Sequence, residues 1–268
     1  MDLSFETDGG IGILGNLGLI VLSTDQTLEQ EMVQLLPAPG IAVYHSRIAM
    51  RKEVAPETLA AMEADLPASA ALLPDDVRFD AIGYGCTSAA TVIGRARVAA
   101  AVKSARPEAK VTEPISATLA ACQALGVTRL GFLTPYVPAV SARMRALLEA
   151  SGLEIAAFGS FNEGRDPVVA RISPASILAG INAVAAQGSC DAVFVACTNL
   201  RCAAIVQQAE RRIGLPVLSS NLTLAWHLLT LAGLSTRRCG FGRLFDGEVS
   251  PVKTSPTAAK NEGAMHHD

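Results

Sequence analysis

An internal repeat is the feature that most constrains how this chain can fold. "DAIGYGCTSAATVIGRA" begins at Asp80 and "DAVFVACTNLRCAAIVQQA" begins at Asp191; in both, Asp-Ala opens an apolar run and a cysteine follows six residues after the Asp. A second pair, "LGLIVLSTDQTLEQEM" from Leu17 and "LGFLTPYVPAVSARM" from Leu130, repeats at an offset of 113 residues against 111 for the first pair. Such self-similarity indicates two related structural units.

Short strand-like runs alternate with Ala-rich helical patterns along most of the chain. The predicted strands are residues 17–22, 41–44, 81–84, 110–112, 129–134, 154–158, 192–196 and 216–219, and the predicted helices include 56–73, 88–103, 138–151, 174–187 and 200–213. Strands separated by helices of this length are typical of parallel sheets with helices on both faces. We therefore expect an α/β protein with two pseudo-symmetric halves.

The halves are expected to be built from discontinuous segments. We assign residues 11–115 and 220–249 to the first half and residues 116–219 to the second half. Residues 1–10 and 250–268 contain few apolar side chains, so we expect disordered tails there.

Composition excludes several classes of function. Half of the 268 residues are hydrophobic, and the net charge is only -3 with scattered basic residues, which is unlike a nucleic-acid-binding protein. The N-terminus carries acids where a secretory signal carries Lys or Arg, and no apolar run is long enough to span a membrane. We expect a cytoplasmic protein whose six cysteines are thiols.

Two cysteines lie where a parallel sheet binds its ligands. Cys86 and Cys197 each follow a predicted strand and precede a predicted helix, and ligands bind beyond the carboxyl ends of such strands. Unpaired N–H groups at a helix N-terminus stabilise a thiolate and can also hold a carboxylate. Hydroxyl and amide groups beside the thiols could add hydrogen-bond donors: Thr87, Ser88, Thr198 and Asn199.

Two opposed thiols suit a reaction at a carbon next to a carboxylate. One thiolate could remove a proton from one face while the other thiol delivers a proton to the opposite face. Alternatively, a thiolate could add to an activated double bond, allow rotation and leave again. A decarboxylase would need only one cysteine.

The remaining motifs predict structural roles. The spacing of Cys190, Cys197 and Cys202 does not fit a zinc site, and no metal is expected. Cys122, Cys190, Cys202 and Cys239 are interpreted as small hydrophobic residues. His227 is interpreted as a hydrogen-bonded core or interface residue. "GGIGILGNLG" precedes a strand instead of following one, so it does not fit a dinucleotide-binding loop.

These residues resemble the aspartate/glutamate racemase superfamily, in the branch that holds maleate cis-trans isomerases, arylmalonate decarboxylases and an ectoine-utilisation protein. The resemblance spans most of residues 12–246. Its most specific parts are the two cysteine corners, "GLIVLSTDQTLEQE", "YHSRIAMRKE", "TPYVPAV" and "GRLF". It implies two Rossmann-like halves with the active site in the cleft between them, no cofactor, and catalytic Cys86 and Cys197.

The resemblance also implies substrate-binding residues. Tyr136 in "TPYVPAV" matches a tyrosine that contacts substrate in maleate isomerases. At two positions where those isomerases carry a substrate-binding asparagine, this chain has Asp25 and Asp166. Ionised aspartate accepts hydrogen bonds but repels a carboxylate, so these residues suit a substrate that also carries a cationic nitrogen, such as an amino acid, a diamino acid or an ectoine-like amidine. Alternatively, both aspartates could cap helices or turns.

The sequence thus predicts a cofactor-independent two-cysteine racemase or cis-trans isomerase that acts on a small carboxylate. The alternatives are an arylmalonate-type decarboxylase that uses Cys197 and a non-catalytic ligand-binding protein on the same fold. Neither nucleic acid nor a membrane is expected as a partner. We expect a homo-oligomer, because apolar segments such as "LTLAWHLLTLAGL" could form a contact between copies, although they could equally cover the core.

Overall fold

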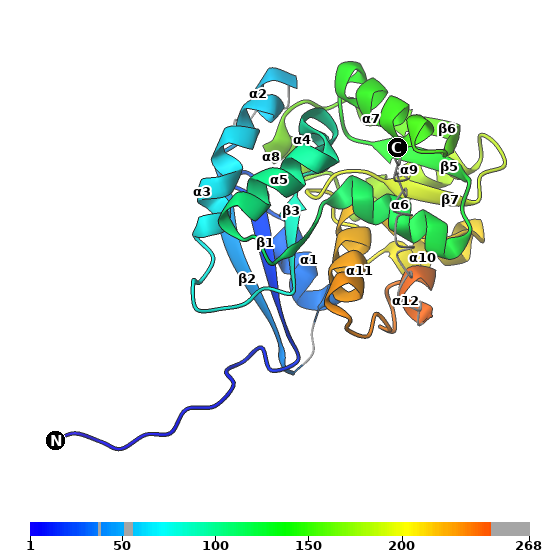
Figure 1. Ribbon diagram of the computed structural model, residues 1–268. Helices are drawn as coiled ribbons and strands as arrows, with labels where there is room; N and C mark the ends of the chain where they lie inside the picture. The colour runs from blue at the N-terminus through cyan, green and yellow to red at the C-terminus, as the bar shows by residue number, and fades with distance from the viewer. Residues whose placement is uncertain (37–38, 51–55, 248–268) are drawn as a thin grey trace, which may run out of the picture.

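The computed structural model describes residues 1–36, 39–50 and 56–247, and within them two parallel four-stranded sheets stand side by side (Figure 1). The first sheet has the order β2-β1-β3-β4 and the second the order β6-β5-β7-β8. The strands are β1 (Gly15–Leu22), β2 (Ile41–Ile48), β3 (Ala81–Gly85), β4 (Lys110–Thr112), β5 (Arg129–Thr134), β6 (Glu154–Ser160), β7 (Ala192–Val195) and β8 (Val217–Ser219). The two sheets thus have the same strand arrangement, and each copy of the sequence repeat corresponds to one sheet.

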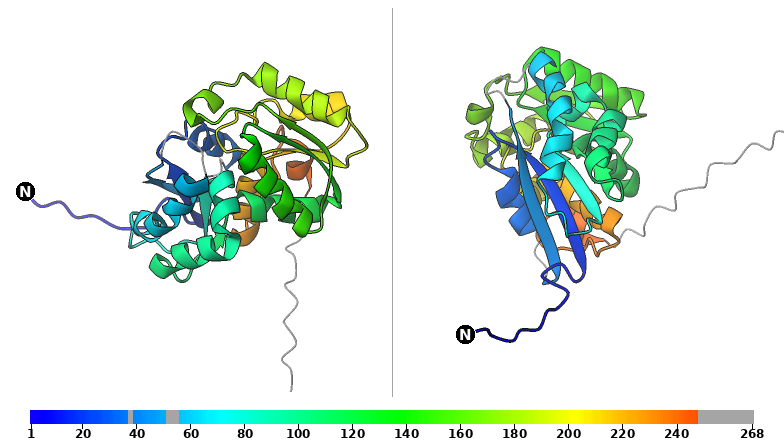
Figure 2. Two further views of the ribbon diagram at one scale, coloured as in Figure 1. Left: turned by 90° about the horizontal axis from the view of Figure 1, so that it is seen from above. Right: turned by 60° about the vertical axis from the view of Figure 1, so that its left-hand side comes forward.

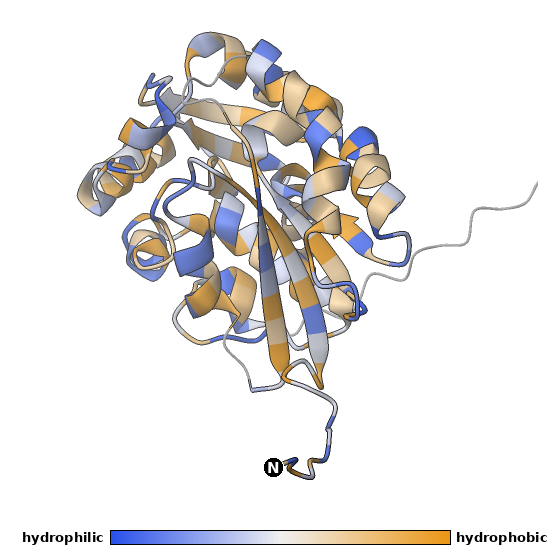
Figure 3. Cartoon of the chain, turned by 90° about the vertical axis from the view of Figure 1, so that its left-hand side faces the viewer, coloured by the Kyte–Doolittle hydropathy of each residue, from blue (hydrophilic) through white to orange (hydrophobic). Residues whose placement is uncertain are grey.

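All eight predicted strands are present, with ends shifted by a few residues at most. They are recognisable because a parallel sheet covered on both faces is made of nearly continuous apolar runs. β3 and β7 are buried along their whole length. Figure 3 shows hydrophobic residues along the strands of the first sheet.

Helices cover the sheets, but three predicted helices differ from the observed ones. The helices are α1 (Leu28–Leu35), α2 (Pro56–Ala61), α3 (Leu66–Ala71), α4 (Thr87–Ile93), α5 (Arg95–Ala105), α6 (Pro114–Leu125), α7 (Pro138–Ala150), α8 (Asp166–Val169), α9 (Pro174–Ala185), α10 (Val206–Ile213), α11 (Ser220–Ala232) and α12 (Arg243–Asp246). The predicted helix at 56–73 is divided into α2, the 3-10 helix Met62–Asp65 and α3. The one at 88–103 is interrupted by Gly94, whose φ of 93° is incompatible with a continuous helix. The one at 200–213 begins only at Val206, after a series of turns.

The two aspartates that open the repeats perform the same task in both halves. The Asp80 carboxylate accepts a hydrogen bond from the Asn16 N–H at 3.0 Å, and the Asp191 carboxylate accepts from the N–H groups of Thr128 (2.9 Å) and Arg129 (2.7 Å). Each aspartate therefore ties the start of the third strand of its half to the start of the first. This equivalence supports the view that the sequence repeat is a structural duplication.

The last long helix of the chain crosses from the second half to the first. α11 follows β8 directly, yet it packs against β3 and β4 of the first sheet and beside α6 (Figures 1 and 2). This packing agrees with the assignment of residues from 220 onward to the first half, while the exact division into domains stays a prediction. α11 also brings its first residues to the boundary between the sheets.

The ends of the chain bear on two further predictions. Residues 1–10 form no helix or strand and are exposed, and they extend away from the sheets (Figure 1). The predicted disordered tail at 250–268 lies outside the described residues. In the described part of the chain, none of the helices combines the length and the apolar character needed to cross a bilayer.

Candidate functional site

Cys86 lies at the predicted strand-to-helix corner. It follows β3 and is the N-cap of α4, and its Sγ accepts a hydrogen bond from the Ala89 N–H at 3.3 Å. The Ser88 hydroxyl lies 3.6 Å from the same sulfur. The first corner therefore places a thiol against the open N–H groups of a helix, as the sequence predicts.

Cys197 occupies a different corner. It follows β7 by two residues, but α10 begins only at Val206, so the prediction that a helix starts directly after this cysteine is wrong. Turns replace the helix, and Cys197 has a φ of 123°, which is unusual for a residue with a side chain. Its Sγ accepts from the Asn199 N–H at 3.4 Å. The Cys197 thiol therefore still has a backbone N–H beside it, but, unlike Cys86, it does not lie at the N-terminus of a helix.

The two corners touch each other. The Thr198 hydroxyl donates to the Gly85 carbonyl oxygen at 3.3 Å, which links the residue after one cysteine to the residue before the other. A second link runs through Ser220 at the start of α11, because its hydroxyl accepts from the Cys197 N–H at 3.0 Å and lies 2.8 Å from the Thr87 hydroxyl. The carboxyl ends of β3 and β7 therefore meet at one place between the halves.

The nine residues predicted for the site are all buried there. Their exposed fractions are between 1% and 5%: Asp25, Cys86, Thr87, Ser88, Tyr136, Asp166, Cys197, Thr198 and Asn199. Both side chains pack in the hydrophobic core, but each sulfur atom also has polar neighbours: the Ala89 N–H and the Ser88 hydroxyl at Cys86, and the Asn199 N–H at Cys197. Both thiols are therefore closed to solvent in this structure.

Asp25 is held by the protein itself. One carboxylate oxygen accepts from the N–H groups of Thr27 and Leu28, both at 2.8 Å, and the other accepts from the Thr198 hydroxyl at 2.8 Å. Both oxygens thus have partners, one at the start of α1 and the other at the second corner. This geometry matches the capping alternative, with the added feature that the cap reaches across to the second corner.

Asn199 also joins the halves. Its side-chain oxygen accepts from the Gln26 N–H at 2.9 Å, and its side-chain nitrogen donates to the Asp166 carbonyl oxygen at 3.3 Å. The Thr27 hydroxyl donates to the Asn199 carbonyl oxygen at 3.0 Å. Asn199 therefore positions three segments around the cysteines.

Asp166 contrasts with Asp25. It is 5% exposed at the start of α8, and its Oδ2 has no hydrogen-bond partner within the protein. Its charge raises the pKa values of Cys86, Cys197 and Asp25, which places it among these groups. A buried polar atom without a partner is rare, and a water molecule, an ion or a ligand would satisfy it.

Tyr136 approaches the second thiol. Burial raises the pKa of Cys197, and the Tyr136 side chain counteracts part of this rise. Tyr136 also lines a cavity of about 520 Å³ together with Ser160, Asn162 and Arg145. The cavity is large enough for a small organic molecule, but neither Cys86 nor Cys197 lines it.

Burial determines the protonation of both thiols. Desolvation raises the pKa of Cys86 to about 12, against a smaller lowering by hydrogen bonds from Ala89 and Ser88. Desolvation likewise raises the pKa of Cys197 well above its usual value. The expectation that a helix N-terminus lowers the thiol pKa is therefore wrong for this closed arrangement, because the desolvation of a buried thiolate outweighs the N–H groups. Both thiols are protonated near neutral pH.

The other candidates lie in structural positions. All six cysteines are free; Cys122, Cys190 and Cys202 are buried as expected, whereas Cys239 is exposed. His227 shares a 2.7 Å hydrogen bond with the Thr112 hydroxyl, and burial lowers its pKa to about 4, which confirms its interpretation as a hydrogen-bonded residue. In the described ranges no group of His, Cys, Asp and Glu could hold a metal ion.

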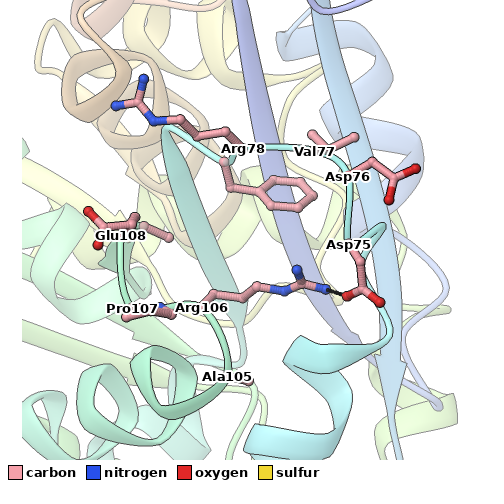
Figure 4. Close-up of a pocket in the computed structure, with 10 residues that line it drawn as sticks. Asp75, Asp76, Val77, Arg78, Ala105, Arg106, Pro107 and Glu108 are labelled. Atoms are coloured by element: carbon pink, nitrogen blue, oxygen red, sulfur yellow. Dashed lines mark hydrogen bonds and ion pairs between the residues drawn. The ribbon is translucent and has the colours of Figure 1, made fainter.

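A surface pocket of about 330 Å³ is lined by residues 75–79, which precede β3, and residues 105–109, which precede β4 (Figure 4). Arg106 reaches across it to Asp75 at 2.9 Å and donates to the carbonyl oxygens of Ala70 and Ala71 at the end of α3. The residues that line this pocket carry no thiol or hydroxyl group. Arg106 is thus occupied in capping a helix, and the pocket offers no chemistry of its own.

Three buried residues at the boundary were missed from the sequence. Ser220 bridges the corners, Asn221 donates to the Thr198 carbonyl oxygen at 2.8 Å, and Glu31 accepts from Asn221 at 2.8 Å. Ser220 and Asn221 lie in no motif, and Glu31 ends the segment "GLIVLSTDQTLEQE" without any role assigned to it, because the roles of all three depend on the return of α11 to the first half. The available signal was "SSN" from the last residue of β8 into α11, which is a polar run before an apolar helix.

Comparisons with known proteins agree with this geometry. A family model described as arylmalonate decarboxylase matches residues 96–245, more than half of the chain. A maleate isomerase of Nocardia farcinica (strain IFM 10152) is 28% identical over 237 residues, which cover 85% of this chain and 94% of the relative. An arylmalonate decarboxylase of Bordetella bronchiseptica is 32% identical over 133 residues, or 49% of this chain and 55% of the relative.

A solved structure is similar over almost the same length. The Nocardia farcinica maleate cis-trans isomerase with a covalently bound succinylcysteine intermediate superposes with a TM-score of 0.79 at 28% identity. The match covers 86% of this chain and 98% of that one. These matches confirm the predicted resemblance and the predicted fold of two pseudo-symmetric α/β halves.

Proposed function

Because the chain belongs to the arylmalonate decarboxylase family, we propose that it is a cofactor-independent isomerase that uses Cys86 and Cys197 to act on a small carboxylate. The observation that carries the proposal is the meeting of both cysteine corners at one buried polar site. The maleate isomerases among its relatives support an isomerase in particular.

The two thiols are given different roles by their surroundings. Cys86 is the N-cap of α4 and receives the Ala89 N–H, so it is the better placed of the two to carry negative charge. Cys197 lies outside any helix terminus, so no helix dipole stabilises its thiolate. We assign Cys86 as the attacking thiolate and Cys197 as the proton donor.

The reaction then proceeds by addition and elimination. Cys86 first gives its proton to water. Its thiolate then adds to one carbon of an activated double bond, forming a C–S bond, and the electron pair of that double bond takes the proton of Cys197 at the neighbouring carbon. Rotation about the new single bond follows. Cys197 recovers the proton as the C–S bond breaks, so Cys86 is again a thiolate and Cys197 again a thiol. The succinylcysteine intermediate of the Nocardia farcinica isomerase is the species that such an addition to maleate produces.

The same pair of thiols can act as a racemase. One sulfur removes the proton next to the carboxylate and the other returns a proton to the opposite face. The unpartnered Oδ2 of Asp166 supports a substrate that also carries a cationic nitrogen, such as an amino acid or a cyclic amidine. Asp25, with both oxygens occupied, is assigned to capping instead.

Isotope exchange tests the proposed function. The protein is incubated in heavy water with maleate, a panel of amino acids and diamino acids, and ectoine-related amidines, and the products are followed by NMR. We expect double-bond isomerisation or deuterium incorporation with at least one of these compounds. Cys86→Ser and Cys197→Ser should each reduce turnover by at least about a hundredfold, because each removes one partner of the proton and nucleophile pair.

Three other results have distinct meanings. Release of CO₂ from an arylmalonate that survives Cys86→Ser but not Cys197→Ser would identify the decarboxylase alternative. Tight binding without turnover would identify a ligand-binding protein. Full activity of both serine variants would refute a role for the thiols. Cys122→Ser is a matched control, because Cys122 is equally buried but lies in α6 outside the site.

A further inference from the structure

The conformation of Cys197 requires support from its neighbours. A non-glycine residue at a φ of 123° is strained, and such residues persist only where the surrounding structure holds them. Hydrogen bonds from outside the turn provide this support: the Cys197 N–H donates to Ser220, and the Thr198 carbonyl oxygen accepts from the Asn221 side chain at 2.8 Å. Both partners belong to α11.

Glu31 fixes the second of these supports. It lies on α1 with 6% of its surface exposed. Its Oε2 accepts from the Asn221 Nδ2 at 2.8 Å, and this is the same nitrogen that donates to the Thr198 carbonyl oxygen. Its Oε1 accepts from the Ala203 N–H at 2.8 Å, farther along the turns that follow Cys197.

We propose that Glu31 is a positioning residue for Cys197, which holds the reactive turn by orienting the Asn221 amide and the Ala203 N–H. The carboxylate is suited to this role because it accepts on both oxygens. The Oδ1 of Asn221 has no hydrogen-bond partner, so Glu31 and the Thr198 carbonyl oxygen together determine which way the amide faces. Glu31 itself lies apart from the reacting atoms and touches neither thiol.

The role depends on the charge state of Glu31. A protonated carboxyl or a glutamine presents a donor to the Asn221 nitrogen, and the amide then gains by rotating half a turn to accept with Oδ1. That rotation removes the donor from the Thr198 carbonyl oxygen. Burial raises the pKa of Glu31 to about 7, so this change falls near neutral pH.

The direction of the pH effect follows from these contacts. Asp25 raises the pKa of Glu31 through its charge, and Cys202 also lies within reach of the Glu31 charge. The turn is held while Glu31 is ionised, above a pH of about 7, and the support is lost as the pH falls below that value. Turnover should therefore decline on the acid side with an apparent pKa near 7.

Glu31→Gln tests the proposal with two measurements. Amide hydrogen exchange at pH 8 is followed in a peptide that covers residues 197–205, and we expect faster exchange there than in the unmodified protein. Turnover of the substrate identified by isotope exchange should fall between about ten- and a hundredfold in kcat with little change in KM, since a displaced catalytic group slows the chemical step. The decline of turnover below a pH of about 7, which we call the acid limb, should be absent from the pH profile of the variant.

Glu210→Gln is the matched control. Glu210 is also 6% exposed, and it accepts from the N–H groups of Val217 and Arg243, away from the turn. Its variant should leave the exchange of residues 197–205 and the acid limb unchanged. If Glu31→Gln does not fold, Asn221→Ala removes the same connection and should give the same local increase in exchange.

The outcomes separate this inference from the proposed function, on which the turnover measurement rests. If no substrate is turned over, the hydrogen-exchange result alone decides the role of Glu31. Unchanged exchange at residues 197–205, or an equal increase in the Glu210→Gln variant, would overturn the inference. Retention of the acid limb in Glu31→Gln would overturn it as well.

Discussion

At the scale of single residues, the site combines groups that are fully bonded with one that is not. The side-chain polar atoms of Asp25 and Asn199 form hydrogen bonds with other segments of the chain, whereas Asp166 has one buried oxygen without a partner. Leaving a buried polar atom unsatisfied typically costs about 1–3 kcal/mol, which a bound ligand could recover. Asp166 is therefore the residue from which substrate selectivity is best explored.

Asp166→Asn should change which substrates are accepted. The substitution replaces a carboxylate with an amide that can donate, so it should weaken binding of a cationic nitrogen and favour a second carboxylate. We expect the ratio of kcat/KM for dicarboxylates over nitrogen-bearing substrates to rise by about ten- to a hundredfold, since a hydrogen bond to a charged group contributes roughly 1.5–3 kcal/mol. Competition between the two substrate types, measured by NMR, gives this ratio directly. An unchanged ratio would assign Asp166 to structure only.

At the scale of strands and helices, the duplication provides a paired experiment. Asp191 ties β7 to β5 and Asp80 ties β3 to β1, but the Asp191 carboxylate accepts from two backbone N–H groups and Asp80 from one. Asp191→Ala should lower the free energy of unfolding at pH 7 by about 1 kcal/mol, and Asp80→Ala by about half as much, because these carboxylates are partly exposed. Urea denaturation measures both. Equal losses of unfolding free energy in the two variants would show that the number of backbone hydrogen bonds does not set the contribution of each carboxylate.

The Asp191 contribution should also depend on pH. Its hydrogen bonds from Thr128 and Arg129 lower the pKa of this carboxyl below its usual value of 3.8. The stabilisation is therefore complete above the unfolded-state pKa and is lost as the pH falls through the lower, folded-state value. The difference in stability between the unmodified protein and Asp191→Ala should accordingly shrink at pH 3.

The elements also show what sequence could and could not predict. Strands were predictable because burial on both faces makes them apolar runs between polar turns. Helix starts were harder, since the helical pattern at 200–213 continues through residues that the structure uses in turns. The contacts of Asn199 and Ala203 with the first half determine those turns. A local pattern contains no information about such partners.

At the scale of the whole molecule, the site exists because two halves share it. The register of the repeats was sufficient to predict that the strand ends before Cys86 and Cys197 meet, since both lie at carboxyl ends of equivalent strands. Sequence could not predict that the site is closed, or that burial keeps both thiols protonated, because desolvation depends on every segment packed over them. Sequence could likewise not predict the contacts among Ser220, Asn221 and Glu31, because these residues become neighbours only when α11 packs on the first half.

The closed site predicts how the thiols react with an alkylating reagent. Cys239 is exposed, whereas Cys86 and Cys197 are 3% and 4% exposed, so iodoacetamide should modify Cys239 first without loss of activity. A slower phase should follow, in which modification of Cys86 or Cys197 and loss of activity proceed together, because the reagent reaches them only through the open form.

A saturated dicarboxylate such as succinate should slow that second phase, since it occupies the site without reacting, and it should leave the Cys239 phase unchanged. Mass spectrometry of peptides quenched at intervals follows each thiol separately, and Cys239→Ser should remove the first phase alone. Activity lost in step with Cys239 would place the functional thiol elsewhere. Rapid modification of Cys86 and Cys197 would show that the site is open in solution, and the burial that raises their pKa values would not then apply.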